Sequence, residues 1–142
     1  MILPDVNVLL YALRDDAVNH REYRRWLTNV VQGSEAYGMC PQVLSAVVRI
    51  STHPRIHVRP TELDTALAFC DALLSPAHCE PIVPGARHWS IFADICRSVS
   101  ATGNLVADAW LAALAIESGC EWITEDRDFA KFPGLRWRSP LE

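Results

Sequence analysis

Short apolar segments and longer stretches of helical periodicity alternate along the whole chain. The first segment, MILP, has the character of a short buried strand, and residues 6–13 follow with a helical pattern. Strands that alternate with helices in this way are typical of a parallel sheet with helices on both faces. We therefore predict an α/β fold, a three-layer sandwich with a short, mainly parallel central sheet. Further strands are expected at residues 35–40, 80–83, 120–124 and 135–137, and further helices at residues 18–31, 41–51, 61–74, 87–99 and 105–117.

The length and composition suit one globular unit. The chain has 142 residues, of which 50% are hydrophobic and 21% are charged, so we expect a single domain over residues 1–142. The longest apolar stretch, residues 106–116, contains Asp108 and is shorter than the roughly 20 residues that span a membrane. No secretory signal pattern follows Met1, and we expect a cytoplasmic protein with no membrane contact. The five cysteines form no CxxC pair, which argues against a zinc ribbon.

The charge of the chain limits how it could bind nucleic acid. A formal net charge of −4 argues against a protein that holds nucleic acid by bulk electrostatic attraction. The basic residues are nevertheless twelve arginines and one lysine. The planar fork of arginine matches a phosphate group better than the ammonium group of lysine does.

Three aspartates follow or face the ends of predicted strands. Asp5 ends the first strand, Asp126 follows the strand at 120–124, and Asp108 lies in the first turns of the helix at 105–117. Because parallel strands end at one edge of the sheet, we expect the three carboxylates to converge there. Three carboxylates this close together cannot all stay ionised unless one of them is protonated or a cation lies among them. With no histidine or cysteine at ligand spacing, the donor oxygens favour Mg²⁺, with Mn²⁺ as an alternative.

Each of these acids also has a local explanation. Asp5 could cap the helix that starts at Val6, and Asp108 could favour a helix dipole. Asp126 and Asp128 could belong to a plain turn within the segment TEDRDF. The joint arrangement of the acids supports a functional site more strongly than any one of them does.

Polar neighbours of the acids are candidates for a supporting role. Asn7 and Thr124 each lie two positions from an acid and can hydrogen-bond a carboxylate or a metal-bound water. A helix-capping asparagine and a strand threonine are the alternatives for these two residues. Elsewhere, Thr61 with Asp64 three positions later predicts a capping box at the start of a helix.

Three blocks of the sequence resemble a known family. DVNVLLYA near the start, GNLVADAWLAALAIESG late and WITEDRDFAKFPGLRW near the end look like the PIN-domain ribonucleases, in particular the VapC toxins of bacterial toxin–antitoxin pairs. The resemblance implies a parallel sheet between helices and cleavage of single-stranded or looped RNA with Mg²⁺ held by acids. It makes Asp5, Asp108 and Asp126 the catalytic and metal-binding acids, with Asp128 as an accessory carboxylate.

The resemblance also implies partners. Toxins of this type form homodimers and are held inactive by a cognate antitoxin whose tail fills the active-site groove. The aromatic helix around Tyr23 and Trp26 is a candidate for that contact, although residues at these positions more often belong to the core.

The sequence departs from the family pattern at one position. Most members carry a glutamate in the helix after the second strand, where this chain reads PQVLSAVVRI and offers Ala46 with Ser45 beside it. No acid lies between Glu35 and Glu62. The loss of one ligand leaves open whether one or two ions bind, and Asp128 is the candidate to compensate.

A mechanism follows from these assignments. A cation held by Asp5 and Asp108 would polarise a phosphodiester oxygen and activate a water for in-line attack, while Asp126 orients that water or holds a second ion. No nucleophilic side chain is required. Arg49 and Arg127 are the candidates for RNA phosphate contacts.

Two other functions remain open. DVNV approaches the DxDx[TV] signature of haloacid-dehalogenase-type phosphatases, but Asn7 stands where that signature needs a proton-donating aspartate. Covalent phosphorylation of Asp5 would favour this alternative. The missing glutamate instead supports a catalytically inactive PIN-like binding module, for which replacing Asp5 by Asn would leave RNA cleavage unchanged.

Overall fold

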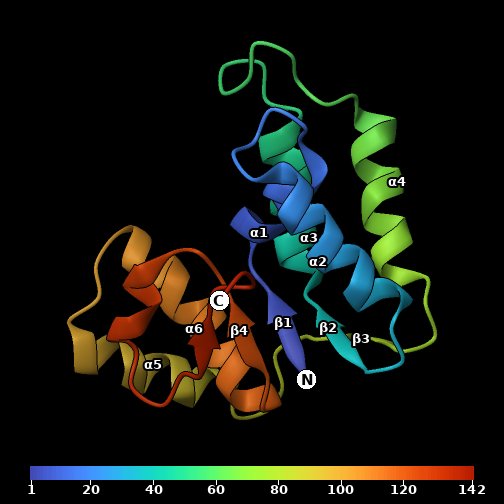
Figure 1. Ribbon diagram of the computed structural model, residues 1–142. Coiled ribbons are helices and arrows are strands. Elements are labelled where there is room, and N and C mark those ends of the chain that lie inside the picture. The colour runs from blue at the N-terminus through green and yellow to red at the C-terminus, as the bar shows by residue number, and fades with distance from the viewer.

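The computed structural model describes residues 1–142 and contains five strands, six α-helices and one 3-10 helix. Figure 1 shows the strands in the lower part of the molecule, with α1–α4 on one side and α5 and α6 on the other. The elements in chain order are β1 (Ile2–Pro4), α1 (Val6–Leu13), α2 (His20–Gln32), β2 (Tyr37–Met39), α3 (Pro41–Ser51), α4 (Leu63–Leu74), β3 (Cys79–Pro81), α5 (His88–Val99), α6 (Asn104–Ser118), β4 (Glu121–Ile123), η1 (Arg127–Lys131) and β5 (Trp137–Arg138).

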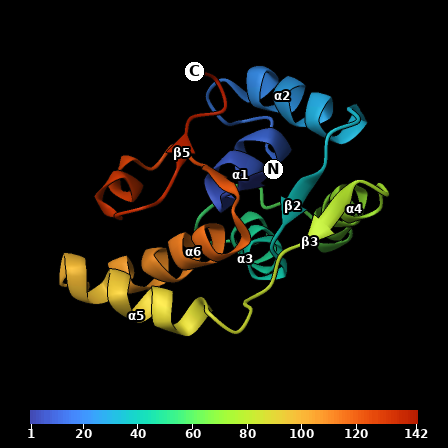
Figure 2. The same cartoon turned by 90° about the horizontal axis from the view of Figure 1, so that it is seen from below.

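All strands belong to one parallel sheet with the order β3-β2-β1-β4-β5. The central strand β1 pairs through Ile2 with Tyr37 on one side and with Glu121 on the other. The chain leaves β1 toward β2 and returns on its other side at β4, so the direction of winding changes next to β1. Viewed from below, α1 and α2 lie on one side of the sheet and α5 and α6 on the other (Figure 2). The predicted three-layer sandwich is confirmed.

Apolar strands and a small-residue helix face form the core. Leu3, Trp122 and Ile123 of the two central strands are fully buried. Helix α6 buries a face of alanines, among them Ala109 and Ala112, which lets its backbone approach the sheet closely. Removing these apolar side chains from water is the main stabilising contribution to such a fold. The same packing fixes the height of α6 above the sheet and hence the position of Asp108.

The structure corrects some local expectations. The strands are shorter than predicted, and the 3-10 helix at 127–131 was not anticipated. The capping box was wrong: the residue before α4 is Glu62, which makes no side-chain cap, while the Thr61 hydroxyl accepts a hydrogen bond from Arg14 at 3.1 Å. A charged donor from a distant segment engages the hydroxyl that the local pattern assigned to a cap. No helix has the length and apolar character needed to cross a membrane.

Helix α6 ends at a glycine whose conformation can be tested. Gly119 has φ +70°, and a Cβ added there would meet no atom within 4 Å. Gly119→Ala therefore introduces backbone strain without a steric clash, and we expect it to lower the free energy of unfolding by about 1 kcal/mol. Urea unfolding measures this loss. Gly119→Asn should cost less than Gly119→Ala, because asparagine tolerates the left-handed region better; equal stability of the alanine variant and the parent would contradict the assignment.

Candidate active site

The junction between β1 and α1 holds a buried carboxylate. Asp5 is only 6% exposed and occupies the N-cap position of α1. Its Oδ1 accepts the backbone N–H of Val6 at 2.6 Å, and its Oδ2 accepts the hydroxyl of Thr124 at 2.7 Å and the side-chain amide of Asn7 at 3.2 Å. The capping role expected as an alternative for Asp5 is therefore present. The capping bond uses Oδ1, while Oδ2 faces the residues that follow β4.

A small polar network ties the loop after β4 to this carboxylate. Thr124 Oγ1 also accepts from the side-chain amide of Asn7 at 3.1 Å and from the backbone N–H of Asp126 at 3.0 Å. The Asn7 side-chain oxygen in turn accepts the backbone N–H of Glu125 at 3.3 Å. Asn7 thus contacts the carboxylate of Asp5, its neighbour in sequence, whereas Thr124 donates to the carboxylate of Asp5 and accepts from the backbone of Asp126. The network fixes the backbone of Asp126 relative to Asp5.

The electrostatics of the site reflect crowding of negative charge. Burial raises the pKa of Asp5 to about 6, and repulsion from Asp108 and Asp126 adds to the rise against the opposing hydrogen bonds from Thr124 and Val6. The pKa of Asp108 is also raised, first by burial and then by repulsion from Asp126 and Asp128. The acids therefore lie near enough to disfavour one another's charge.

The positions of Asp108 and Asp126 show which of the local roles suggested for them are present. Asp108 is the fifth residue of α6, beyond its first turn, which contains no acid. An interaction with the helix dipole is therefore a weak explanation for Asp108. Asp126 Oδ1 accepts the backbone N–H of Asp128 at 2.9 Å and so caps the 3-10 helix. The turn interpretation of Asp126 holds, and its second carboxylate oxygen makes no hydrogen bond within the protein.

The donor set fits a hard divalent cation, although no ready-made metal centre is present. No group of three or more His, Cys, Asp or Glu side chains is arranged to hold a metal ion. The groups that crowd the site are nonetheless all carboxylates, and the pKa of the buried Asp5 is elevated first by burial and then by repulsion from its acidic neighbours. Oxygen ligands with excess negative charge are what Mg²⁺ and Mn²⁺ prefer.

The β2 side of the site carries no acid. Ile2 pairs with Tyr37, and the same register places Asp5 level with Cys40, directly before α3. There Ala46 is half-buried and Ser45 is exposed. The structure therefore offers no local substitute on α3 for a glutamate. Asp128, the candidate to compensate, lies on the opposite side with Asp126 and makes an ion pair with Lys131 at 3.3 Å.

The two predicted RNA-binding arginines differ in their surroundings. Arg49 is exposed on α3, about two turns beyond Gln42 at the start of that helix. Arg127 follows Asp126 directly and makes an ion pair with Glu142 at 3.6 Å, with 84% of its side chain exposed. Ion pairs this exposed contribute little to stability, so Arg127 is free to exchange its partner.

Glu125 was missed by sequence reasoning. Its Oε1 accepts the hydroxyl of Tyr23 at 2.8 Å and the hydroxyl of Ser139 at 2.7 Å. Glu125 therefore joins α2 and the C-terminal segment to the loop that carries Asp126. The segment TEDRDF displays this acid, but nothing in the sequence indicates its two distant partners. Tyr23 is only 7% exposed, in line with a core role rather than a surface contact.

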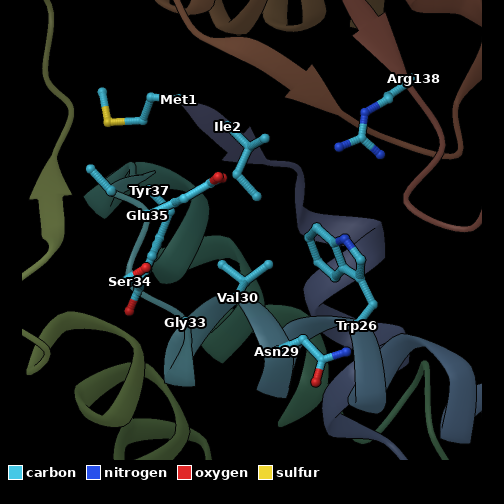
Figure 3. Close-up of a pocket in the computed structure, with 11 residues that line it drawn as sticks. Met1, Ile2, Trp26, Asn29, Val30, Gly33, Ser34, Glu35, Tyr37 and Arg138 are labelled. Carbon is cyan, nitrogen blue, oxygen red and sulfur yellow. The ribbon is translucent and has the colours of Figure 1, made fainter.

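A separate hollow lies at the other end of the sheet. Its volume is about 590 Å³, and it is formed by the start of β1, the end of α2 and the segment before β2. Figure 3 shows Met1 and Ile2 facing the α2 residues Trp26 and Val30 across this space. It includes none of the predicted acids and lies at the amino ends of the strands. Ligands of open parallel sheets bind at the carboxyl ends, where Asp5 lies.

The fold and the acidic edge define a class, and comparisons with known proteins identify it. An α/β sandwich with aspartates after β1 and β4 and on α6 is the arrangement of a PIN-type domain. The PIN domain family matches residues 2–135, and the chain belongs to this family.

Individual relatives agree with this assignment. Ribonuclease VapC43 of Mycobacterium tuberculosis is 41% identical over 142 residues, which covers all of this chain and 97% of the relative. Ribonuclease VapC25 of the same organism is 36% identical over 140 residues, covering 99% of each protein. Among solved structures, VapBC2 from Rickettsia felis bound to a promoter DNA fragment has a TM-score of 0.72 at 18% identity, covering 98% of each chain. M. tuberculosis VapC20, a sarcin–ricin loop cleaving toxin, has a TM-score of 0.63 at 16% identity and covers 96% of this chain and 99% of its own. At these identities the structures show the likeness of the fold.

The raised pKa of Asp5 leads to a prediction about how the stability of the protein depends on pH. Its value of about 6 in the folded protein exceeds the ordinary 3.8, so the folded state binds the proton more tightly and loses stability as pH rises between about 4 and 6. The full loss amounts to about 3 kcal/mol. We expect the unfolding free energy of the parent, minus that of Asp5→Asn, to fall by most of this amount, about 2 kcal/mol, between pH 4 and pH 7.

Chemical denaturation at a series of pH values provides the measurement. Taking the difference between parent and variant removes the titration of the acids that do not interact with Asp5, while the coupling of Asp5 to Asp108 and Asp126 stays in the measured difference. Adding Mg²⁺ at pH 7 should restore stability to the parent and not to Asp5→Asn. A difference that stays constant with pH would contradict the raised pKa of Asp5.

Proposed function

We propose that this chain is a Mg²⁺-dependent endoribonuclease that cleaves RNA phosphodiester bonds and acts as the toxin of a toxin–antitoxin pair. The observation that carries the proposal is the buried Asp5 carboxylate, which experiences repulsion from Asp108 and Asp126. The relatives of this chain include ribonucleases named VapC, and the solved structures similar to it include VapBC assemblies. Mn²⁺ is a plausible replacement for Mg²⁺, because both accept carboxylate oxygens.

Each residue of the site has a defined task in this mechanism. Asp5 and Asp108 would hold the cation, and Asp126 would orient the attacking water from the loop after β4. Asn7 and Thr124 fix the Asp5 carboxylate through the hydrogen bonds described above, and Asp128 adds negative charge next to Asp108. When bound, the cation supplies charge neutralisation, polarisation of the phosphodiester and activation of water.

The hydrogen bonds of Asn7 disfavour the phosphatase alternative. A second acid in that position would act as the proton donor, whereas Asn7 uses its amide to contact Asp5 and Thr124 and its oxygen to accept from Glu125. Asparagine has no proton to give in that role. Hydrolysis by a positioned water requires no covalent intermediate on Asp5.

The proposal includes RNA contacts and protein partners. Arg49 and Arg127 are proposed to contact phosphates, with Arg49 on the acid-free side of the site and Arg127 beside Asp126. We further propose a homodimer that a cognate antitoxin holds inactive in the cytoplasm. VapB and VapC occur together in structures similar to this chain, which supports the antitoxin.

Asp108→Asn tests the catalytic assignment. Because it removes one charge without changing side-chain size, we expect an intact fold and a loss of RNA cleavage of roughly 10²–10³-fold, together with loss of toxicity on expression. Cleavage of labelled RNA in Mg²⁺ is the direct assay. Asp94→Asn on α5 is the matched control, since Asp94 is 79% exposed and pairs only with Arg97. Full activity in Asp108→Asn would reject the mechanism, whereas the absence of cleavage by the parent itself would support the inactive binding module.

A further inference from the structure

Positive charge without counter-charge is concentrated in one segment of the chain. Residues 36–61 contain no Asp or Glu, yet they include Arg49, Arg55 and Arg59, while the chain as a whole carries a net charge of −4. All three arginines are exposed. None of them makes an ion pair or donates a side-chain hydrogen bond, unlike Arg87, Arg97, Arg127, Arg136 and Arg138. The other unpaired arginines lie on α2, which also carries Glu22. We call residues 49–60 the basic arm.

A buried arginine from another segment holds the basic arm in place. Arg14, at the end of α1, is only 9% exposed. Its guanidinium donates to the Thr61 hydroxyl at 3.1 Å and to the Arg59 carbonyl at 3.1 Å. It also donates to both carboxylate oxygens of Asp16, at 3.1 and 2.7 Å. Four of the five N–H groups of Arg14 are thereby used within the protein, so Arg14 serves as an anchor rather than as a ligand-binding group.

The backbone of the basic arm is itself ordered by hydrogen bonds. The Thr61 N–H donates to the Ser51 carbonyl at 2.8 Å and closes the loop at its base. Within the loop, the N–H groups of Ile56 and His57 donate to the His53 carbonyl. The arm therefore presents its arginines from a fixed backbone, which lowers the entropy lost when they bind a ligand.

The arm stands at a defined distance from the acids. Helix α3 starts level with Asp5 and has 11 residues, which corresponds to a length of about 16 Å. Figure 1 shows the loop after α3 at the end of α1 and α3 that lies far from the strands. The arginines of the arm thus extend from the acid-free side of the site away from the sheet. Arg55 and Arg59, which follow the end of α3 opposite to Asp5 (Figure 1), would therefore contact the flanking strand rather than the bond that Asp5 and Asp108 would act on.

We propose that the basic arm binds phosphates of the RNA segment that flanks the cleaved bond, and that Arg14 is the positioning residue for the arm. The inference rests on the proposed function and identifies where the substrate strand runs. Unpaired guanidinium groups on a fixed backbone suit phosphates. In a two-fold symmetric contact, a second copy of this chain would place its own basic arm against this one, and the like charges would repel.

Equilibrium RNA binding in EDTA tests the arm independently of cleavage. We expect Arg55→Ala/Arg59→Ala to weaken binding of a labelled single-stranded RNA about tenfold, measured by fluorescence anisotropy. The slope of log affinity against log salt should become shallower by about 1.4, because each lost phosphate contact on a single strand contributes about 0.7. Arg21→Ala/Arg25→Ala on α2 is the matched control, since it removes two exposed, unpaired arginines outside the arm.

The outcomes separate this inference from the proposed function. Equal losses of RNA affinity in both double variants would show that bulk charge, and not the basic arm, binds the RNA. Unchanged RNA affinity in the arm variant would also reject the arm as a binding site. Either result, combined with inactive Asp108→Asn, leaves the ribonuclease mechanism in place. Normal cleavage by Asp108→Asn with weakened RNA binding by the arm variant would reject the mechanism while retaining the arm.

Two variants test the positioning role of Arg14. Arg14→Lys keeps the charge but removes the guanidinium group that contacts Thr61 and Arg59. A shallower slope of log affinity against log salt in this variant would therefore reflect misplaced arginines of the arm rather than lost charge. Thr61→Val removes a single acceptor and remains informative should Arg14→Lys fail to fold. In cleavage assays both should raise KM with little change in kcat. Parent-like KM and salt slope in folded Thr61→Val and Arg14→Lys would reject the positioning role.

Discussion

The carboxylate of Asp5, held inside the protein between β1 and α1, is the constraint on which the site depends. Burying a charged carboxylate costs several kcal/mol unless partners compensate. Here the compensation is partial: Val6, Asn7 and Thr124 donate hydrogen bonds, while Asp108 and Asp126 add repulsion. The unsatisfied part of that cost can be relieved by a cation. Under the proposed function, the group that lowers the stability of this junction is also the group that would bind the cation.

Capping and catalysis are compatible uses of one side chain. Asp5 caps α1 with one oxygen and presents the other to Thr124, and Asp126 likewise caps the 3-10 helix with one oxygen. The local structural explanations offered by the sequence were correct for these residues without excluding a shared site. Asp108 differs, because its place beyond the first turn of α6 gives it no capping role.

The layered fold and the central part of the site could be predicted because both follow from periodicity. Alternating strands and helices imply a parallel sheet, and strands that end at one edge bring Asp5 and Thr124 together. Contacts that depend on tertiary packing could not be predicted in this way. The Thr61 hydroxyl accepts from Arg14 instead of capping a helix, and Glu125 accepts hydroxyls from Tyr23 and Ser139, which are far from it in sequence.

The charge of the site is distributed unevenly, with acids on the β1, β4 and α6 side and none on α3.

A crystal grown or soaked with Mn²⁺ tests most directly whether the acids share a cation. The account predicts an anomalous difference peak between the carboxylates of residues 5 and 108, with that of residue 126 drawn toward it. Ordered, well-separated carboxylates with no peak among them at saturating Mn²⁺ would contradict the account.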